Sequence, residues 1–148
     1  MSSRLAAMTI AILGTGLLGS GFARALRKKG EPVRVWNRTI ERARPLAADG
    51  IEVADTAEAA VRGASRVHVV VSDDAAVDSV LEAASPGLAR GTFVIDHSTT
   101  STAGTIRRTR DWNGKGIRYQ HAPVFMGPQN ALESTGLMLI SGEPAVID

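Results

Sequence analysis

Cysteine is absent from this chain of 148 residues, and aromatic residues make up only 4% of it. The lack of cysteine excludes disulfide bonds, thiolate catalysis and cysteine-ligated metals, and we expect no metal site. No apolar run approaches the roughly 20 residues needed to cross a membrane, and residues 1–7 lack the hydrophobic core of a signal peptide. We therefore expect a cytoplasmic protein without a membrane partner.

An excess of charge of either sign is also missing, because 17 basic and 15 acidic residues give a net charge of +2. The densest basic cluster is Arg107, Arg108 and Arg110. A solvated helix face explains this cluster better than a nucleic-acid contact does, so we expect no nucleic-acid partner. Alanine, valine and glycine are abundant, as is typical of parallel α/β folds in a single domain.

Short apolar runs alternate with helical patterns along the chain. This alternation predicts βαβ crossovers and a doubly wound, mainly parallel sheet with helices on both faces. Strands are expected at residues 8–13, 33–36, 51–53, 67–71, 92–95, 117–121 and 137–140, and helices at 17–29, 39–49, 56–62, 74–84 and 102–112. Pro45 weakens the second helix, and an irregular segment is expected between the last two strands.

A glycine loop of the form G-x-G-x-x-G follows the first predicted strand and opens an amphipathic helix. In such a loop Gly14 allows the tight turn, Gly16 lets a pyrophosphate approach the backbone, and Gly19 lets the helix pack closely. The phosphates would meet free N–H groups and the positive end of the helix dipole. The loop predicts a dinucleotide-binding domain of the Rossmann type, in which the cofactor contacts Gly14, Thr15, Gly16, Leu17, Leu18 and Gly19.

The residues after the second predicted strand are Asn37, Arg38 and Thr39. Domains that bind NAD commonly place an acidic residue here, which accepts hydrogen bonds from the ribose and would repel a 2′-phosphate. Arg38 can instead pair with that phosphate, and Asn37 and Thr39 can donate further hydrogen bonds. The alternative is that Arg38 is an ordinary surface arginine. We expect NADP to be preferred over NAD.

With these residues in place, the chain resembles the N-terminal domain of the β-hydroxyacid dehydrogenases from about Met8 to Gly142. This family includes 3-hydroxyisobutyrate dehydrogenase and 6-phosphogluconate dehydrogenase, with the imine reductases as relatives. The resemblance rests on residues 12–19 and 37–39, on Val71-Ser72-Asp73, on Asp96-His97-Ser98-Thr99, and on residues 121–127. It implies that the cofactor contacts Ser72, Asp73 and Ser98, and that the substrate contacts Ser98, Thr99, Thr100, Phe125, Met126 and Gly127.

The segment His121-Ala122-Pro123-Val124-Phe125-Met126-Gly127 is similar to the family's D-A-P-V-S-G-G but departs from it at three positions. His121 replaces the aspartate, Phe125 the serine and Met126 the first glycine. Phenylalanine and methionine cannot supply the hydroxyl or the backbone room that line a substrate carboxylate in typical members. The change makes a bulkier or less polar substrate more plausible, as in the imine reductases.

Two histidines invite a catalytic interpretation. His121 could be a general acid, although a structural hydrogen bond at a strand end is the favoured interpretation. His97 between Asp96 and Ser98 suggests a hydrolase triad, but adjacent strand residues point to opposite faces and cannot form the relay. Phe125 and Met126 could equally be core residues or pocket wall.

The resemblance implies a hydride transfer between nicotinamide and a small hydroxy acid or semialdehyde. The family's proton donor is a lysine in a second, helical domain, and none of Lys28, Lys29 and Lys115 matches its position. We therefore expect one dinucleotide-binding domain over residues 1–148, inactive alone, with the helical substrate and dimerisation domain absent and a full-length parent that is a homodimer or higher oligomer. The alternatives are an imine reductase-like NADPH domain and a non-catalytic nucleotide-binding module.

Overall fold

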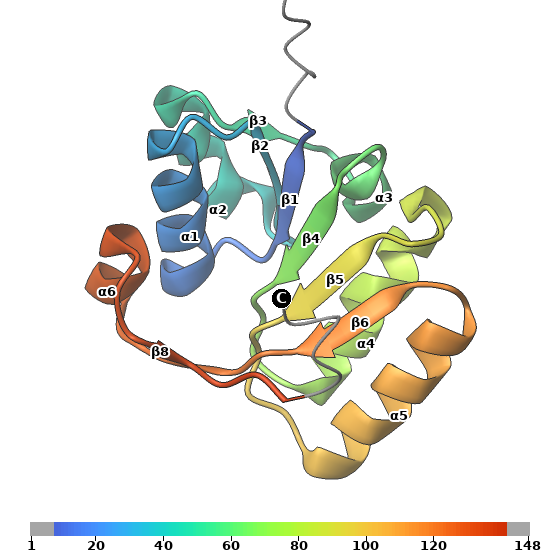
Figure 1. Ribbon diagram of the computed structural model, residues 1–148. Helices are drawn as coiled ribbons and strands as arrows, with labels where there is room; N and C mark the ends of the chain where they lie inside the picture. The colour runs from blue at the N-terminus through green and yellow to red at the C-terminus, as the bar shows by residue number, and fades with distance from the viewer. Residues whose placement is uncertain (1–7, 142–148) are drawn as a thin grey trace, which may run out of the picture.

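The computed structural model of the chain describes residues 8–141, and Gly142, where the family resemblance ends, lies outside them (Figure 1). Six strands form one sheet in the order β3-β2-β1-β4-β5-β6, and every neighbouring pair is parallel. This topology confirms the predicted doubly wound sheet. The strands are β1 (Ile10–Leu13), β2 (Val33–Trp36), β3 (Glu52–Val53), β4 (Arg66–Val69), β5 (Phe93–Asp96) and β6 (Arg118–His121).

Helices cover both faces of the sheet, as the sequence predicts (Figure 1). Successive β1 residues alternate between the two faces: Ile12 packs with α1 (Leu17–Lys28) and α2 (Ile40–Ala43). Ala11 and Leu13 pack in a second apolar cluster. That cluster contains buried residues of α3 (Ala57–Val61), α4 (Asp74–Ala84) and α5 (Thr102–Gly114). None of the helices in the described part of the chain is long and apolar enough to span a membrane.

The segment predicted as one helix over residues 39–49 is divided in two. Helix α2 ends at Ala43, and a 3₁₀ helix, Arg44–Asp49, continues from it with Pro45 in its first turn. Proline has no N–H to donate to an earlier carbonyl, but it is tolerated in the first turn of a new helix. Pro45 therefore determines where the α-helical geometry stops.

The segment predicted as irregular before residue 137 contains regular structure, so that prediction is wrong. Strand β7 (Val124–Phe125) pairs antiparallel with β8 (Leu137–Met138) in a separate two-stranded ribbon. Helix α6 (Pro128–Glu133) connects these two strands in the sequence and packs against α1 (Figure 1). A Cβ added to Gly21 would lie 2.9 Å from the Cβ of Ala131. The absence of a side chain at Gly21 is therefore what lets α6 lie this close to α1.

The prediction of a solvated helix face for the arginine cluster is wrong for Arg108. Arg107 and Arg110 are exposed, whereas Arg108 is completely buried between α5 and α4. Its guanidinium Nη2 lies 2.6 Å from Asp74 Oδ1, and its Nη1 lies 3.3 Å from Asp78 Oδ1. Burial of a charge requires such partners, because an isolated ion in the interior is strongly disfavoured.

We predict that Gly21→Ala lowers the free energy of unfolding by about 1–3 kcal/mol, because the added methyl group overpacks the α1–α6 contact. Gly114→Ala is the matched control: it is also a helical glycine, but a Cβ there meets no atom within 4 Å. The control variant should be stabilised by up to about 1 kcal/mol, since alanine favours the helix over glycine. Denaturant unfolding followed by circular dichroism measures both, and equal stability of the two variants would contradict the proposed contact.

Candidate functional site

The glycine loop lies between the carboxyl end of β1 and the start of α1. Gly14 has a φ of 104°, and a Cβ there would lie 2.1 Å from the carbonyl oxygen of Val70. A Cβ at Gly19 would lie 1.9 Å from the carbonyl oxygen of Gly14. Around a Cβ at Gly16, by contrast, no atom lies within 4 Å. The backbone at two of the glycines is therefore closely packed, and at the third it is open to an approaching ligand.

The amide side chain of Asn37 connects the glycine loop to the end of β2. Its Oδ1 accepts a hydrogen bond from the backbone N–H of Thr15 at 2.9 Å, and its Nδ2 donates to the carbonyl oxygen of Thr39, also at 2.9 Å. Both polar atoms of the amide thus have partners in the protein. Sequence reasoning proposed Asn37 as a hydrogen-bond donor to the cofactor, and the geometry in addition makes it a link between two loops.

A groove of about 480 Å³ runs from the glycine loop along α1 towards α6. Arg24 and Arg42 line it together with Gly16 and Ser20, and the first turn of α1 carries no acidic residue. Arg38 and Thr39 are exposed next to it, at the end of β2. The positive end of the α1 dipole and Arg42 suit the groove to an anion, whereas Arg24 is already paired with Asp49 at 2.8 Å. Arg42 was missed by sequence reasoning, although it lies only four residues after Arg38, on the short helix α2.

The segments after β4 and β5 meet at the same edge of the sheet. Ser98 is buried, and its Oγ accepts a hydrogen bond from the backbone N–H of Val71 at 3.0 Å. Asp73 caps α4 by accepting from the N–H of Ala76 at 2.8 Å. Ser72 and Thr99 are exposed, and Thr100 is half-buried. The predicted site residues after these two strands thus come together next to the glycine loop, as the sheet order requires.

The triplet Asp96-His97-Ser98 forms no catalytic relay, which confirms the prediction. Asp96 is fully buried, and its two oxygens accept from the Ser98 N–H at 2.9 Å and from the Tyr119 hydroxyl at 2.6 Å. Burial and then the neighbouring Asp96 raise the pKa of Tyr119, so the phenol stays protonated. The ring of His97 instead contacts His68.

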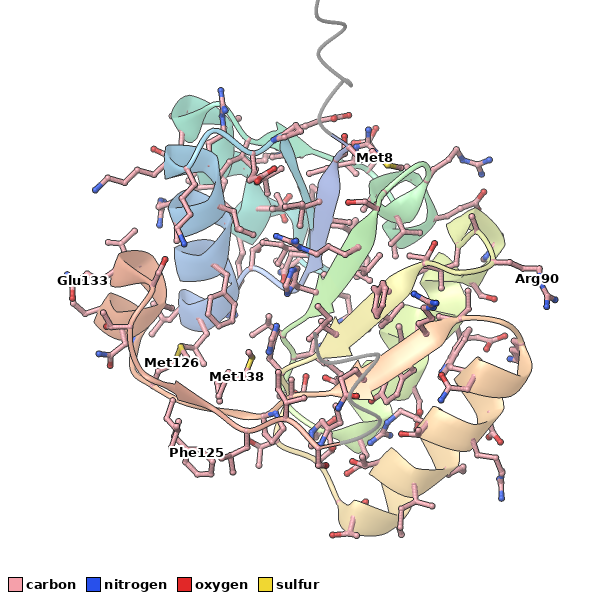
Figure 2. The ribbon with its side chains drawn as sticks, in the orientation of Figure 1. Met8, Arg90, Phe125, Met126, Glu133 and Met138 are labelled. Atoms are coloured by element: carbon pink, nitrogen blue, oxygen red, sulfur yellow. The ribbon has the colours of Figure 1, made fainter. Side chains whose placement is uncertain are left out.

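The residues of the substituted segment, 121–127, lie in different environments from one another. His121 Nε2 lies 2.8 Å from the carbonyl oxygen of Ser98, which is the structural hydrogen bond that sequence reasoning favoured. Phe125 points away from the molecule with 63% of its surface exposed, so it is not a core residue. Met126 and Met138 point inwards (Figure 2) and line a cavity of about 290 Å³ beneath the β7–β8 ribbon. Gly127 is the N-cap of α6.

The three lysines lie away from this edge. Lys28 and Lys29 are at the carboxyl end of α1, opposite the glycine loop, and the ammonium of Lys115 lies 4.4 Å from the ring centre of Trp112. Within residues 8–141, no three histidine, aspartate or glutamate side chains gather into a group that could hold a metal ion. The described residues thus offer the backbone of the glycine loop, arginine side chains and hydroxyl groups at this edge of the sheet.

Residues 9–148 match the family described as the NAD binding domain of 6-phosphogluconate dehydrogenase. The chain belongs to this family. The resemblance to the β-hydroxyacid dehydrogenases is thereby confirmed, and the chain is an NAD-binding domain of their type.

Three relatives illustrate how far the similarity to this NAD-binding domain extends. The uncharacterized oxidoreductase YfjR of Bacillus subtilis is 30% identical over 93% of the chain and 49% of its own length. A 3-hydroxyisobutyrate dehydrogenase from Mycobacterium tuberculosis with L-serine superposes with a TM-score of 0.90 and 26% identity, over 95% of the chain and 48% of that protein. A reductive aminase from Aspergillus terreus in complex with NADPH4, cyclohexanone and allyl amine superposes with a TM-score of 0.77 and 29% identity, over 83% of the chain and 43% of that protein. The chain spans about half the length of the curated relatives it matches.

His68 and His97 form a hydrogen-bonded pair on β4 and just after β5. His97 Nδ1 lies 2.9 Å from the carbonyl oxygen of Ala122, and His97 Nε2 lies 2.9 Å from His68 Nδ1. Because a carbonyl only accepts, His97 Nδ1 carries a hydrogen, and His68 Nδ1 donates to the remaining lone pair of His97. Burial, followed by the charges of His97 and Arg66, lowers the pKa of His68 to about 3. Burial also lowers the pKa of His97. Both rings are therefore neutral at physiological pH.

We predict that the free energy of unfolding falls as the pH is lowered from about 6.5 towards 3. Histidines of the unfolded chain take up protons near pH ~6.5, whereas His68 in the folded protein does so only near pH 3. Each such difference contributes up to about 1.4 kcal/mol per pH unit. Denaturant unfolding between about pH 5 and 7.5 measures the slope. His68→Leu should flatten it, while Gln120→Leu, a neutral neighbour lining the same small cavity, should not. An unchanged slope in His68→Leu would disprove the assignment.

Proposed function

We propose that this chain is the NADP-binding domain of an oxidoreductase that transfers a hydride between nicotinamide and a small hydroxy acid or semialdehyde. The observation that carries the proposal is the end of β2, where Arg38 is exposed just before α2 and Arg42, on α2, lines the groove beside the glycine loop. An arginine pair is suited to the 2′-phosphate that distinguishes NADP from NAD. The reductive aminase among the relatives is described in complex with NADPH4, which supports the same choice.

The residues of the chain fit such a dinucleotide along the whole edge of the sheet. In the proposal the backbone at residues 14–19 receives the pyrophosphate, and Arg38, Arg42 and Thr39 bind the phosphorylated ribose. Ser72, Asp73 and Ser98 contact the nicotinamide half. When bound, NADP supplies or accepts the hydride. The protein contributes position and charge: the hydrogen bond of Asn37 fixes the end of β2 to the glycine loop, and that of Ser98 fixes the loop after β5 to the one after β4.

Substrate binding is proposed for Ser98, Thr99, Thr100 and Gly127, and for Phe125 and Met126 in the segment just before Gly127. Phe125 and Met126 also favour a second candidate, an imine reductase-like domain, since an exposed phenyl ring and a half-buried thioether suit a less polar substrate. In both cases the remaining pocket, the proton donor and the contacts of a homodimer or larger homo-oligomer come from a helical domain in the other half of the full-length protein. The relatives are about twice as long as the chain.

Arg38→Asp should weaken the binding of NADPH and leave that of NADH unchanged or slightly tighter, because the new carboxylate repels the 2′-phosphate. The ratio of the two dissociation constants should change by about tenfold or more, which corresponds to ~1.4 kcal/mol. Titration calorimetry of the chain with each cofactor measures both constants. An unchanged ratio would refute the assignment of Arg38.

Two further variants complete this test. Arg42→Ala should also lower the affinity for NADPH more than that for NADH, because it removes the second cation from the groove. Arg110→Asp provides the control: it reverses the charge of an exposed arginine on α5, where its partner is the adjacent Asp111. If Arg110→Asp changed the ratio as much as Arg38→Asp, the effect would be one of net charge and not of a specific contact.

The 148-residue chain should bind NADPH without oxidising it at an appreciable rate. Neither of the lysines of α1 nor Lys115 lies near the proposed nicotinamide position, so the site as described has no amino group to supply a proton. Loss of NADPH absorbance in the presence of aldehydes, keto acids, and imines measures turnover. Robust oxidation with any of these would show that the chain itself contains the catalytic machinery.

A further inference from the structure

An ion pair and two hydrogen bonds connect the first residue of α4 to α5, with a fully buried Arg108 and a partly exposed Asp74. Asp74 is the first residue of α4, and both of its carboxylate oxygens are used. Oδ1 accepts from Arg108 Nη2 at 2.6 Å and from Ser101 Oγ at 3.1 Å, while Oδ2 accepts from the backbone N–H of Ser101 at 2.9 Å. The Ser101 N–H and then Arg108 hold the pKa of Asp74 at about 2, so the carboxylate stays ionised.

The surrounding residues are adapted to this contact. Ser101 is the N-cap of α5, where its Oγ accepts from the N–H of Gly104 at 3.0 Å. A Cβ at Gly104 would lie 2.0 Å from Asp74 Oδ1, so a glycine is required for the carboxylate to approach α5. Arg108 contributes a side chain with no exposed surface. An apolar side chain in place of the buried Arg108 would often stabilise the contact between the helices as well, so stability alone does not explain this arrangement.

The ion pair lies directly behind the two loops of the candidate site. Asp74 follows Ser72 and Asp73 in the loop after β4, and Ser101 follows residues 98–100 in the loop after β5. The two loops are also connected at their beginnings, where the Val71 N–H donates to Ser98 Oγ. Two polar links, one at each end, therefore fix the distance between the loops.

We propose that Asp74 and Arg108 are positioning residues for the nicotinamide half of the cofactor, holding the loops after β4 and β5 at the spacing that this half requires. The inference rests on the proposed function. If the 2′-phosphate binds at the end of β2 and the pyrophosphate at the glycine loop, a dinucleotide crossing the sheet edge places its other half at β4 and β5. Asp74 acts through the loops, because its oxygens are already occupied by Arg108 and Ser101.

The test compares two ligands on the same variant. NADPH spans the whole edge, whereas adenosine 2′,5′-bisphosphate occupies only the part at β2 and the glycine loop. Asp74→Asn removes the charge of the nearer of the two carboxylates that contact Arg108, and Asp78 keeps the other. The affinity for NADPH should fall by about tenfold or more, since small displacements of positioned groups have large effects. The affinity for the bisphosphate should change by less than about twofold. Titration calorimetry measures both affinities.

Two other variants separate positioning from general destabilisation. Arg108→Lys retains the positive charge but not the planar guanidinium, so it should lower the affinity for NADPH less than Asp74→Asn does. It also decides the question by the same comparison if Asp74→Asn does not fold. Arg110→Met is the control, since it removes an exposed pair with the adjacent Asp111 on α5, leaves both partners of Arg108 in place and should not change the affinity for either ligand.

The outcomes distinguish the two proposals. Selective loss of NADPH affinity supports the positioning role. Equal weakening of both ligands, or of neither, in a folded variant overturns it. If the unaltered chain bound neither NADPH nor the bisphosphate, the proposed function itself would fail, whatever the variants did.

Discussion

The contact on which the site depends is between backbone atoms. The carbonyl oxygen of Gly14 lies where a side chain at residue 19 would begin, and the carbonyl oxygen of Val70 lies where one at residue 14 would begin. Three segments, the end of β1, the first turn of α1 and the end of β4, therefore meet with no room for a Cβ. This approach directs the amino terminus of α1 at the sheet edge and leaves the backbone at Gly16 facing open space.

Polar side chains then fix the loops around this contact. Asn37 joins the end of β2 to the glycine loop, and Ser98 joins the loop after β5 to the one after β4. The carboxylate of Asp96 accepts one hydrogen bond from the backbone N–H of Ser98 and another from the hydroxyl of Tyr119. Hydrogen bonds of this kind are directional, so they specify the positions of the loops more narrowly than apolar packing does. A ligand would meet an edge that is already ordered.

The strands and most helices could be predicted because their periodicity is local, and α4 begins and ends where its apolar pattern does. Helix α6 could not, since six residues show little of a helical period and the helix depends on contact with Gly21 far away in the sequence. The burial of Arg108 was missed for a similar reason: its partner Asp74 is on another helix. The glycines and Arg38 carried a local signal, whereas Arg42 became a candidate only when the groove brought it next to Gly16.

The seating of α6 on α1 has a consequence for the order of folding. Gly21 and Ala131 lie about a hundred residues apart in the sequence, yet their helices are in direct contact. Closing a loop of that length has a high entropic cost, which is recovered only when both surfaces already exist. We therefore expect helix α6 to dock on α1 after α1 and the sheet have formed. Because Pro128, Gln129 and Leu132 of α6 line the groove beside the glycine loop, that groove is complete only once this long-range contact has formed.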